Sequence, residues 1–73
     1  MTNASTLIAQ IAANETYVNE DCAVTRNEMI DAYCEQHWDM LVAHYGTEDD
    51  CEVFEALKNA VDVEAGICII LQA

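Results

Sequence analysis

The sequence contains no proline and only two glycines, and only two of its 73 residues are Lys or Arg. Because it also has no internal repeat, low-complexity tract or proline-rich linker, we expect residues 1–73 to form a single domain. The scarcity of basic residues argues against direct binding to nucleic acid or to an anionic membrane, since both need Lys and Arg to neutralise phosphate groups.

No segment has the features of a targeting sequence or of a membrane span. The first fifteen residues, MTNASTLIAQIAANE, lack a basic region, and their apolar run is too short for either role. We therefore expect a cytosolic protein. In a reducing cytosol the four cysteines, which are Cys22, Cys34, Cys51 and Cys68, would be small apolar core residues. An oxidising compartment would instead allow two disulfides, in any of three connectivities.

The motifs of catalytic and metal sites are also missing. There is no CxxC pair, so a zinc site would require Cys34, His37 and His44 to converge with a further ligand. The acidic segment that starts at Glu48 lacks the central Gly of a calcium loop. Cys34 is followed by Glu35, and a neighbouring carboxylate raises the pKa of a thiol and lowers its reactivity. We expect no enzymatic activity, no cofactor and no metal.

Acidic residues dominate what the sequence does contain. Asp and Glu number 14, the formal net charge is −12 and the pI is near 4.1, although 53% of the residues are hydrophobic and can build a core. A small domain is usually comfortable with a net charge of about 2 to 8 in magnitude. The expected partners are therefore basic proteins or divalent cations. The alternative explanation is that the charge serves solubility alone.

The longest periodic stretch runs from Thr25 to Gly46 and predicts one helix about 30 Å long, at about 1.5 Å per residue. Thr25 and Glu28 have the spacing of a capping box, which predicts the helix start. Gly46 is suited to the left-handed conformation that ends many helices. One face carries apolar and aromatic residues at steps of three and four: Ile30, Tyr33, Cys34, His37, Leu41, His44 and Tyr45, flanked by Met29 and Met40.

The opposite face of this helix is a row of carboxylates, here called the acidic ridge, formed by Glu28, Asp31, Glu35 and Asp39. Like charges three or four residues apart destabilise a helix, and three successive pairs cost on the order of 1 kcal/mol. The ridge therefore suggests a surface shaped for a cationic partner. Trp38 lies at its border and is either an interface anchor or the edge of the core.

The remaining segments predict an α+β fold, with three helices packed on one or two short strands. A helix is expected over Leu7–Ala13, capped by Ser5 or Thr6 and ended by Asn14, and another from Thr47 to about residue 60. Residues 15–24 are expected to form a loop with a short strand at Tyr17 and Val18. Residues 67–72 predict a C-terminal strand, with 61–64 as its hairpin partner or as the tail of the preceding helix. The alternative is an all-α fold with an extended C-terminal tail.

These features favour a small inhibitor that occupies the basic groove of a nucleic-acid-binding protein. Helical carboxylates recur every 4.5 to 6 Å, at about 1.5 Å per residue, close to the roughly 6 to 7 Å steps between phosphates on one strand. Phage-encoded anti-CRISPR and anti-restriction proteins are similar in physical type, although no motif matches a particular family. The predicted partner-binding residues are Glu28, Asp31, Glu35, Trp38, Asp39, Glu48, Asp49 and Glu52. The alternative is an assembly module, either a homodimer or an antitoxin-like partner, that uses the strand at Ile67–Leu71.

Overall fold

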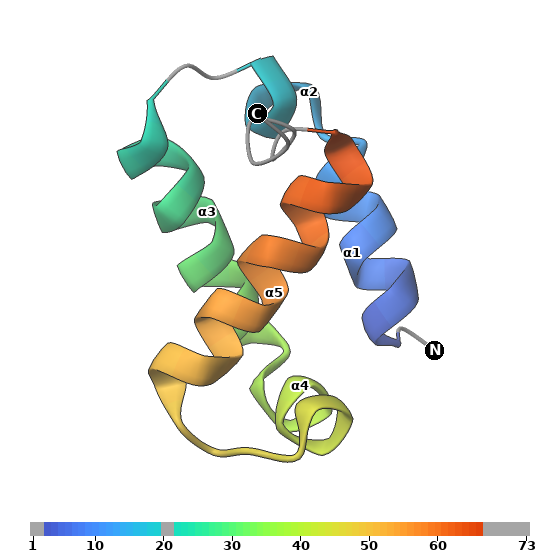
Figure 1. Ribbon diagram of the computed structural model, residues 1–73, viewed down its shortest axis with the longest axis vertical. Helices are drawn as coiled ribbons and strands as arrows, with labels where there is room; N and C mark the ends of the chain where they lie inside the picture. The colour runs from blue at the N-terminus through green and yellow to red at the C-terminus, as the bar shows by residue number, and fades with distance from the viewer. Residues whose placement is uncertain (1–2, 20–21, 67–73) are drawn as a thin grey trace, which may run out of the picture.

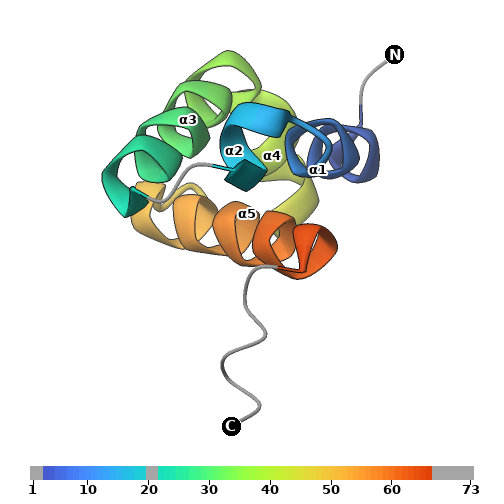
Figure 2. The ribbon, with the colours of Figure 1, turned by 90° about the horizontal axis from the view of Figure 1, so that it is seen from above.

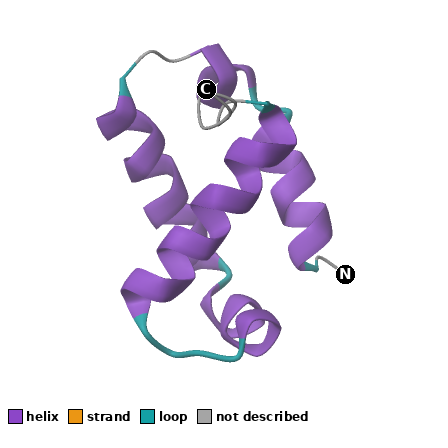
Figure 3. Cartoon of the chain, viewed as in Figure 1, coloured by secondary structure: helices purple, strands orange, loops and turns teal. Residues whose placement is uncertain are grey.

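A computed structural model of the chain describes residues 3–19 and 22–66 and shows them as five α-helices (Figure 1). These are α1 (Ala4–Ala12), α2 (Glu15–Asn19), α3 (Ala23–Gln36), α4 (Trp38–Tyr45) and α5 (Asp50–Ala65). Of the described residues 84% are helical and none lies in a strand (Figure 3). The predicted α+β class is therefore wrong, and the domain is all-helical over this part of the chain. The strand predicted for residues 67–72 lies outside the described residues.

Helix α5 is the element on which the others pack. It contacts α1, α3 and α4, and Figure 2 shows α1, α2 and α3 on one side of it. Its buried apolar residues are Val53, Leu57 and Val61, which lie four residues apart and so form one stripe along the helix. Cys51, which we expected to be a core residue, is exposed in the first turn of α5. None of the helices in the described ranges has both the length and the apolar composition that a membrane span needs.

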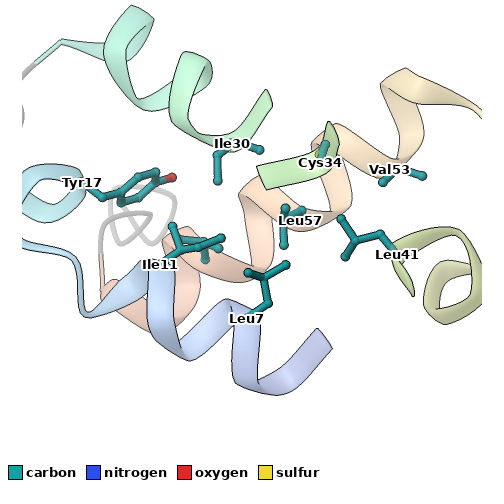
Figure 4. Packing of buried hydrophobic residues seen from close by; sticks show 9 residues of the cluster. Leu7, Ile11, Tyr17, Ile30, Cys34, Leu41, Val53 and Leu57 are labelled. Atoms are coloured by element: carbon teal, nitrogen blue, oxygen red, sulfur yellow. The ribbon is translucent and has the colours of Figure 1, made fainter. Parts of the chain in front are cut away.

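The hydrophobic core is one cluster to which each of the five helices contributes (Figure 4). The buried members are Leu7, Ile11, Tyr17, Ile30, Cys34, Leu41, Val53, Leu57 and Val61. Of the apolar face predicted between residues 30 and 45, Ile30, Cys34 and Leu41 are buried, whereas His44 is exposed. Met29, Tyr33, Trp38, Met40 and Tyr45 are partly buried against the cluster.

Two asparagines define the N-terminal helices. Asn3 Oδ1 accepts a hydrogen bond from the Thr6 amide at 2.8 Å, so Asn3 caps α1 and the predicted cap at Ser5 or Thr6 is wrong. Asn14 does not end this helix but starts the next, because its Oδ1 accepts from the amides of Thr16 and Tyr17 at 2.9 and 3.4 Å. The loop and strand predicted for residues 15–19 are therefore wrong, and a short helix takes their place.

Tyr17 explains why α2 is a helix although its residues favour extended structure. The side chain is fully buried, and its hydroxyl donates to Asp62 Oδ1 at 2.5 Å. Asp62, itself buried, also accepts from Lys58 Nζ at 2.9 Å. The Tyr17 carbonyl accepts from Arg26 Nε at 3.2 Å, which joins α2 to α3. Tertiary contacts therefore override the local preference for a strand.

The predicted helix from Thr25 to Gly46 is two helices, divided at His37. The backbone of His37 has φ −122° and ψ 29°, outside the helical region, and Figure 1 shows α4 nearly along its axis where α3 is seen from the side. The change of direction lets α4 contact α1 and α5, so that Leu41 reaches the core. A straight helix of this length would carry Leu41 past the small core.

Of the predicted helix ends, the one at Gly46 is confirmed, and those at Thr25 and near residue 60 are wrong. Helix α3 begins at Ala23, so Thr25 lies inside it and the predicted capping box is wrong. Gly46 takes the left-handed conformation at φ 72°, as expected, and its amide donates to Val42 O at 2.8 Å. Helix α5 continues to Ala65, beyond the predicted end near residue 60, so residues 61–64 are its tail and not a hairpin strand.

The buried hydrogen bond from Tyr17 to Asp62 should contribute measurably to stability. We expect Tyr17→Phe to lower the free energy of unfolding by about 1.5–3 kcal/mol, because a hydrogen bond to a charged group is lost while the ring remains. Urea denaturation followed by circular dichroism measures this change. Tyr33→Phe, at a half-buried tyrosine of α3, is the matched control and should change stability by less than about 0.5 kcal/mol. Equal effects of the two substitutions would contradict the assignment.

Candidate partner-binding surface

A surface hollow of about 380 Å³ lies where α3, α4 and α5 meet. Asp31, Cys34 and Glu35 of α3, Trp38 of α4 and Asp50 of α5 line it, and we call it the α3–α5 hollow. The three carboxylates are exposed, Trp38 is half-buried against the core, and Cys34 is buried. The hollow therefore combines an aromatic wall and a buried thiol with three carboxylates from two helices.

Two smaller hollows, of about 300 Å³ each, adjoin this one and share lining residues with it. One is lined by Val24, Asn27, Glu28, Asp31 and Phe54. The other is lined by Glu35, Gln36, His37, Trp38, Asp39 and Met40. Each carboxylate of the acidic ridge thus lines at least one hollow, and the ridge with Trp38 forms one continuous surface.

The cations of the described chain lie elsewhere. No Lys or Arg is among the described residues that line the three hollows. The ion pair between described residues joins Lys58 to Asp62, and Arg26 Nε bonds to the Tyr17 carbonyl. No salt bridge found between described residues joins a basic side chain to the carboxylates of the acidic ridge. Their charge faces solvent.

The three other predicted site residues do not line these hollows. Asp49 caps α5, accepting from the amides of Cys51 and Glu52 at 2.9 and 3.1 Å, so the helix starts at Asp50 and not at Thr47 as predicted. The Glu52 carboxylate accepts from Thr47 Oγ1 at 2.8 Å. Glu48 is exposed in the connection between α4 and α5. Asp49 and Glu52 therefore have structural partners.

Asp50 is the residue of the hollow that the sequence argument missed. Asp50 lies in the first turn of α5, where the helix dipole favours a carboxylate, and its position beside α3 depends on how the two helices pack. The signal was available in the pattern of α5. Once Val53 and Leu57 face the core, Asp50 lies one turn before Val53 on the same helix, near the side that packs on α3.

Cys34 is buried at the hollow, and the half-buried Tyr45 has an enclosed hydroxyl group. Burial raises the pKa of the Cys34 thiol, and the Asp31 carboxylate raises it further. Burial likewise raises the pKa of Tyr45, with a smaller contribution from Cys34, and the Tyr45 hydroxyl has no hydrogen-bond partner among the described residues. Both groups are therefore protonated at neutral pH. The nearby carboxylate acting on Cys34 is Asp31, and not Glu35 as the sequence suggested.

We expected no metal site, and the candidate ligands in the sequence were Cys34, His37 and His44. Of these, Cys34 is buried in α3, His37 lies at the helix break and His44 is exposed on α4. Within residues 3–19 and 22–66, no group of three His, Cys, Asp or Glu side chains is arranged to hold a metal ion.

Comparison of the chain with protein-family models, curated proteins and solved structures finds no match. The surface itself is therefore the guide to function.

The capping role of Asp49 predicts a separation between two substitutions. We expect Asp49→Ala to lower the free energy of unfolding by about 0.5–2 kcal/mol, because two amide groups of α5 lose their acceptor. Asp49→Asn should stay within a few tenths of a kcal/mol of the original chain, since Asn caps helices as well as Asp does. Thermal and urea denaturation measure both. A loss of stability in Asp49→Asn as large as in Asp49→Ala would mean that the charge, and not the cap, matters.

The raised pKa of Cys34 predicts slow alkylation. In a variant whose other cysteines are serines, we expect iodoacetamide at pH 8 to modify folded Cys34 at least about tenfold more slowly than the urea-unfolded chain. The reason is that a raised pKa lowers the thiolate fraction at that pH, and burial limits access. Mass spectrometry gives the rates. The corresponding chain with Cys51 alone, which is exposed, should react at similar rates folded and unfolded. Fast modification of folded Cys34 would contradict its burial.

Proposed function

We propose that this protein is a small inhibitor that binds the basic nucleic-acid groove of another protein, as a nucleic-acid mimic of the anti-CRISPR or anti-restriction type. The observation that supports it best is the meeting of Asp31 and Glu35 with Asp50 around one hollow, which no Lys or Arg of the described residues lines. A domain that needed acidity only for solubility would not need to gather its carboxylates on one face.

The spacing of these groups suits a groove that binds phosphates. Asp31 and Glu35 are one helical turn apart, about 6 Å along the axis at 1.5 Å per residue. Phosphates on one nucleic-acid strand recur at steps of about 6 to 7 Å. Lys and Arg side chains placed for a phosphate row can therefore pair with successive carboxylates of α3.

The fold holds the helix backbones beneath the carboxylates in place before any partner binds. Ile30 and Cys34 anchor α3 in the core, and Val53 anchors the first turns of α5 beside it. Little conformational entropy of the backbone is then lost on binding. The net charge of −12 would in addition speed encounters with a basic protein.

The setting that we propose is the cytosol of a host cell, with the gene carried by a phage or another mobile element. The partner is a protein whose groove normally holds DNA or RNA. Nucleic acid itself is not the ligand, because the surface has the same sign of charge as a phosphate backbone.

Two variants with equal charge test this function. Asp31→Asn, Glu35→Gln and Asp50→Asn together neutralise the hollow, while Glu15→Gln, Glu55→Gln and Glu64→Gln remove the same number of charges from exposed positions outside it. The tagged proteins are incubated with host lysate at low salt. We expect the hollow variant to retain at least about tenfold less of a nucleic-acid-binding protein than the original chain, while the control variant retains it.

The retained protein is then challenged with duplex DNA or RNA and with a salt ramp. Mimicry requires that nucleic acid displaces the partner and that moderate salt weakens the complex. Equal retention by both variants, or a complex that nucleic acid does not displace, would refute the proposal. Salt-independent self-association in gel filtration would instead favour the assembly alternative, whose strand at Ile67–Leu71 lies outside the described residues.

A further inference from the structure

We infer that the α3–α5 hollow receives an arginine side chain of the partner and selects it over lysine. This inference rests on the proposed function, because the hollow belongs to the same surface. It adds the chemical identity of the group that would lie at the centre of the interface.

Trp38 supplies the aromatic wall of the hollow. It is half-buried, packs against the core and is the only tryptophan of the sequence. Tryptophan is the aromatic side chain that attracts cations most strongly over its face. A guanidinium is planar and weakly hydrated, so it stacks on an indole more readily than the compact, strongly hydrated ammonium of lysine does.

The carboxylates at the hollow suit the donors of a guanidinium. Asp31 and Glu35 come from α3 and Asp50 from α5, so the acceptors lie on more than one side of an occupant. Arginine has five N–H donors in a fixed fork and can bond two carboxylates while its face remains on the indole. Lysine has three donors on a single nitrogen but no planar face, so it cannot stack flat on the indole while it bonds two carboxylates.

Cys34 provides an observation that is independent of the charges. Its side chain lines the hollow, is only 6% exposed, and forms no hydrogen bond to a described residue. A neutral thiol sulfur is a weak acceptor, so an N–H group that reaches it from the hollow would satisfy it. The hollow thus has an unpartnered acceptor within it as well as carboxylates around it.

The size of the hollow fits a protruding side chain better than a free small molecule. Sites that enclose small molecules have volumes of about 300–1,000 Å³ and cover most of the ligand. The α3–α5 hollow, at about 380 Å³, is near the lower end and its carboxylates are exposed. A side chain delivered by a protein surface needs no such enclosure.

Two peptides, hexa-arginine amide and hexa-lysine amide, provide the direct test because they carry equal charge. Each is titrated at low salt into the original chain, with Trp38 fluorescence and calorimetry as readouts. We expect hexa-arginine to bind about three- to tenfold more tightly and to change Trp38 emission, while hexa-lysine leaves the emission nearly unchanged. Trp38→Leu should bring the two affinities within about twofold of each other.

A second pair of variants guards against a folding defect in Trp38→Leu. Glu35→Gln with Asp50→Asn should weaken hexa-arginine binding by at least about threefold, whereas Glu55→Gln with Glu64→Gln should change it by less than twofold. Equal affinities for the two peptides, or no change in Trp38 emission, would overturn the arginine inference while leaving charge mimicry intact. A failure in the lysate experiment with the arginine preference preserved would refute the mimicry alone.

Discussion

Burial of the apolar stripe of α5 is the interaction on which the rest of the structure depends. Val53, Leu57 and Val61 are fully buried, and side chains from every other helix of the described chain join them in one cluster. A domain of this size buries only a little more than about 60% of its unfolded surface, so no helix can be spared from that cluster. The positions of α1, α3 and α4 around α5 follow from this requirement, and with them the meeting of α3 and the first turn of α5 that forms the hollow.

The distribution of the two basic side chains makes this hollow electrostatically distinct. Lys58 pairs with the buried Asp62, and Arg26 bonds to the carbonyl of the tyrosine that anchors α2. Both therefore support the junction of α2 with its neighbours, at the other end of α3 from Glu35 and Trp38. The carboxylates that line the hollow are left to solvent. Their mutual repulsion lowers the stability of the fold slightly. A bound cationic partner would relieve this repulsion.

The elements that could be predicted from the sequence are those fixed by local chemistry. The helix end at Gly46 and the apolar spacing of Val53, Leu57 and Val61 can be recognised in the sequence. Both the left-handed conformation of glycine and the helical period involve only a few neighbouring residues. The predictions of a strand at Tyr17 and of an uninterrupted helix through His37 were wrong for a common reason. Tyr17 is held by Asp62, 45 residues away, and the turn at His37 is set by how α4 covers α5. Neither contact is visible in a local window.

The acidic ridge also follows from local periodicity. Glu28, Asp31, Glu35 and Asp39 share a surface because three of them follow the period of one helix and the fourth begins the next. The structure adds Asp50 to this surface and gives Asp49 a capping role, because which of three adjacent acidic residues caps the helix depends on where α5 starts. The burial of Val53 in the core fixes this choice. If α5 were rotated by one residue, a different carboxylate would lie toward α3.

The break at His37 connects fold and site most directly. In a continuous helix, Trp38 would lie three residues after Glu35, at the edge of the acidic ridge. Its ring would then contact only the solvent-exposed side of that helix. With α4 turned toward α5, Trp38 packs on the core and still lines the hollow together with Glu35 and Asp50. The core contact restricts the indole, which limits how far the ring can move relative to the carboxylates. The distortion that made the helix hard to predict is thus the feature that places an aromatic wall beside the acidic ridge.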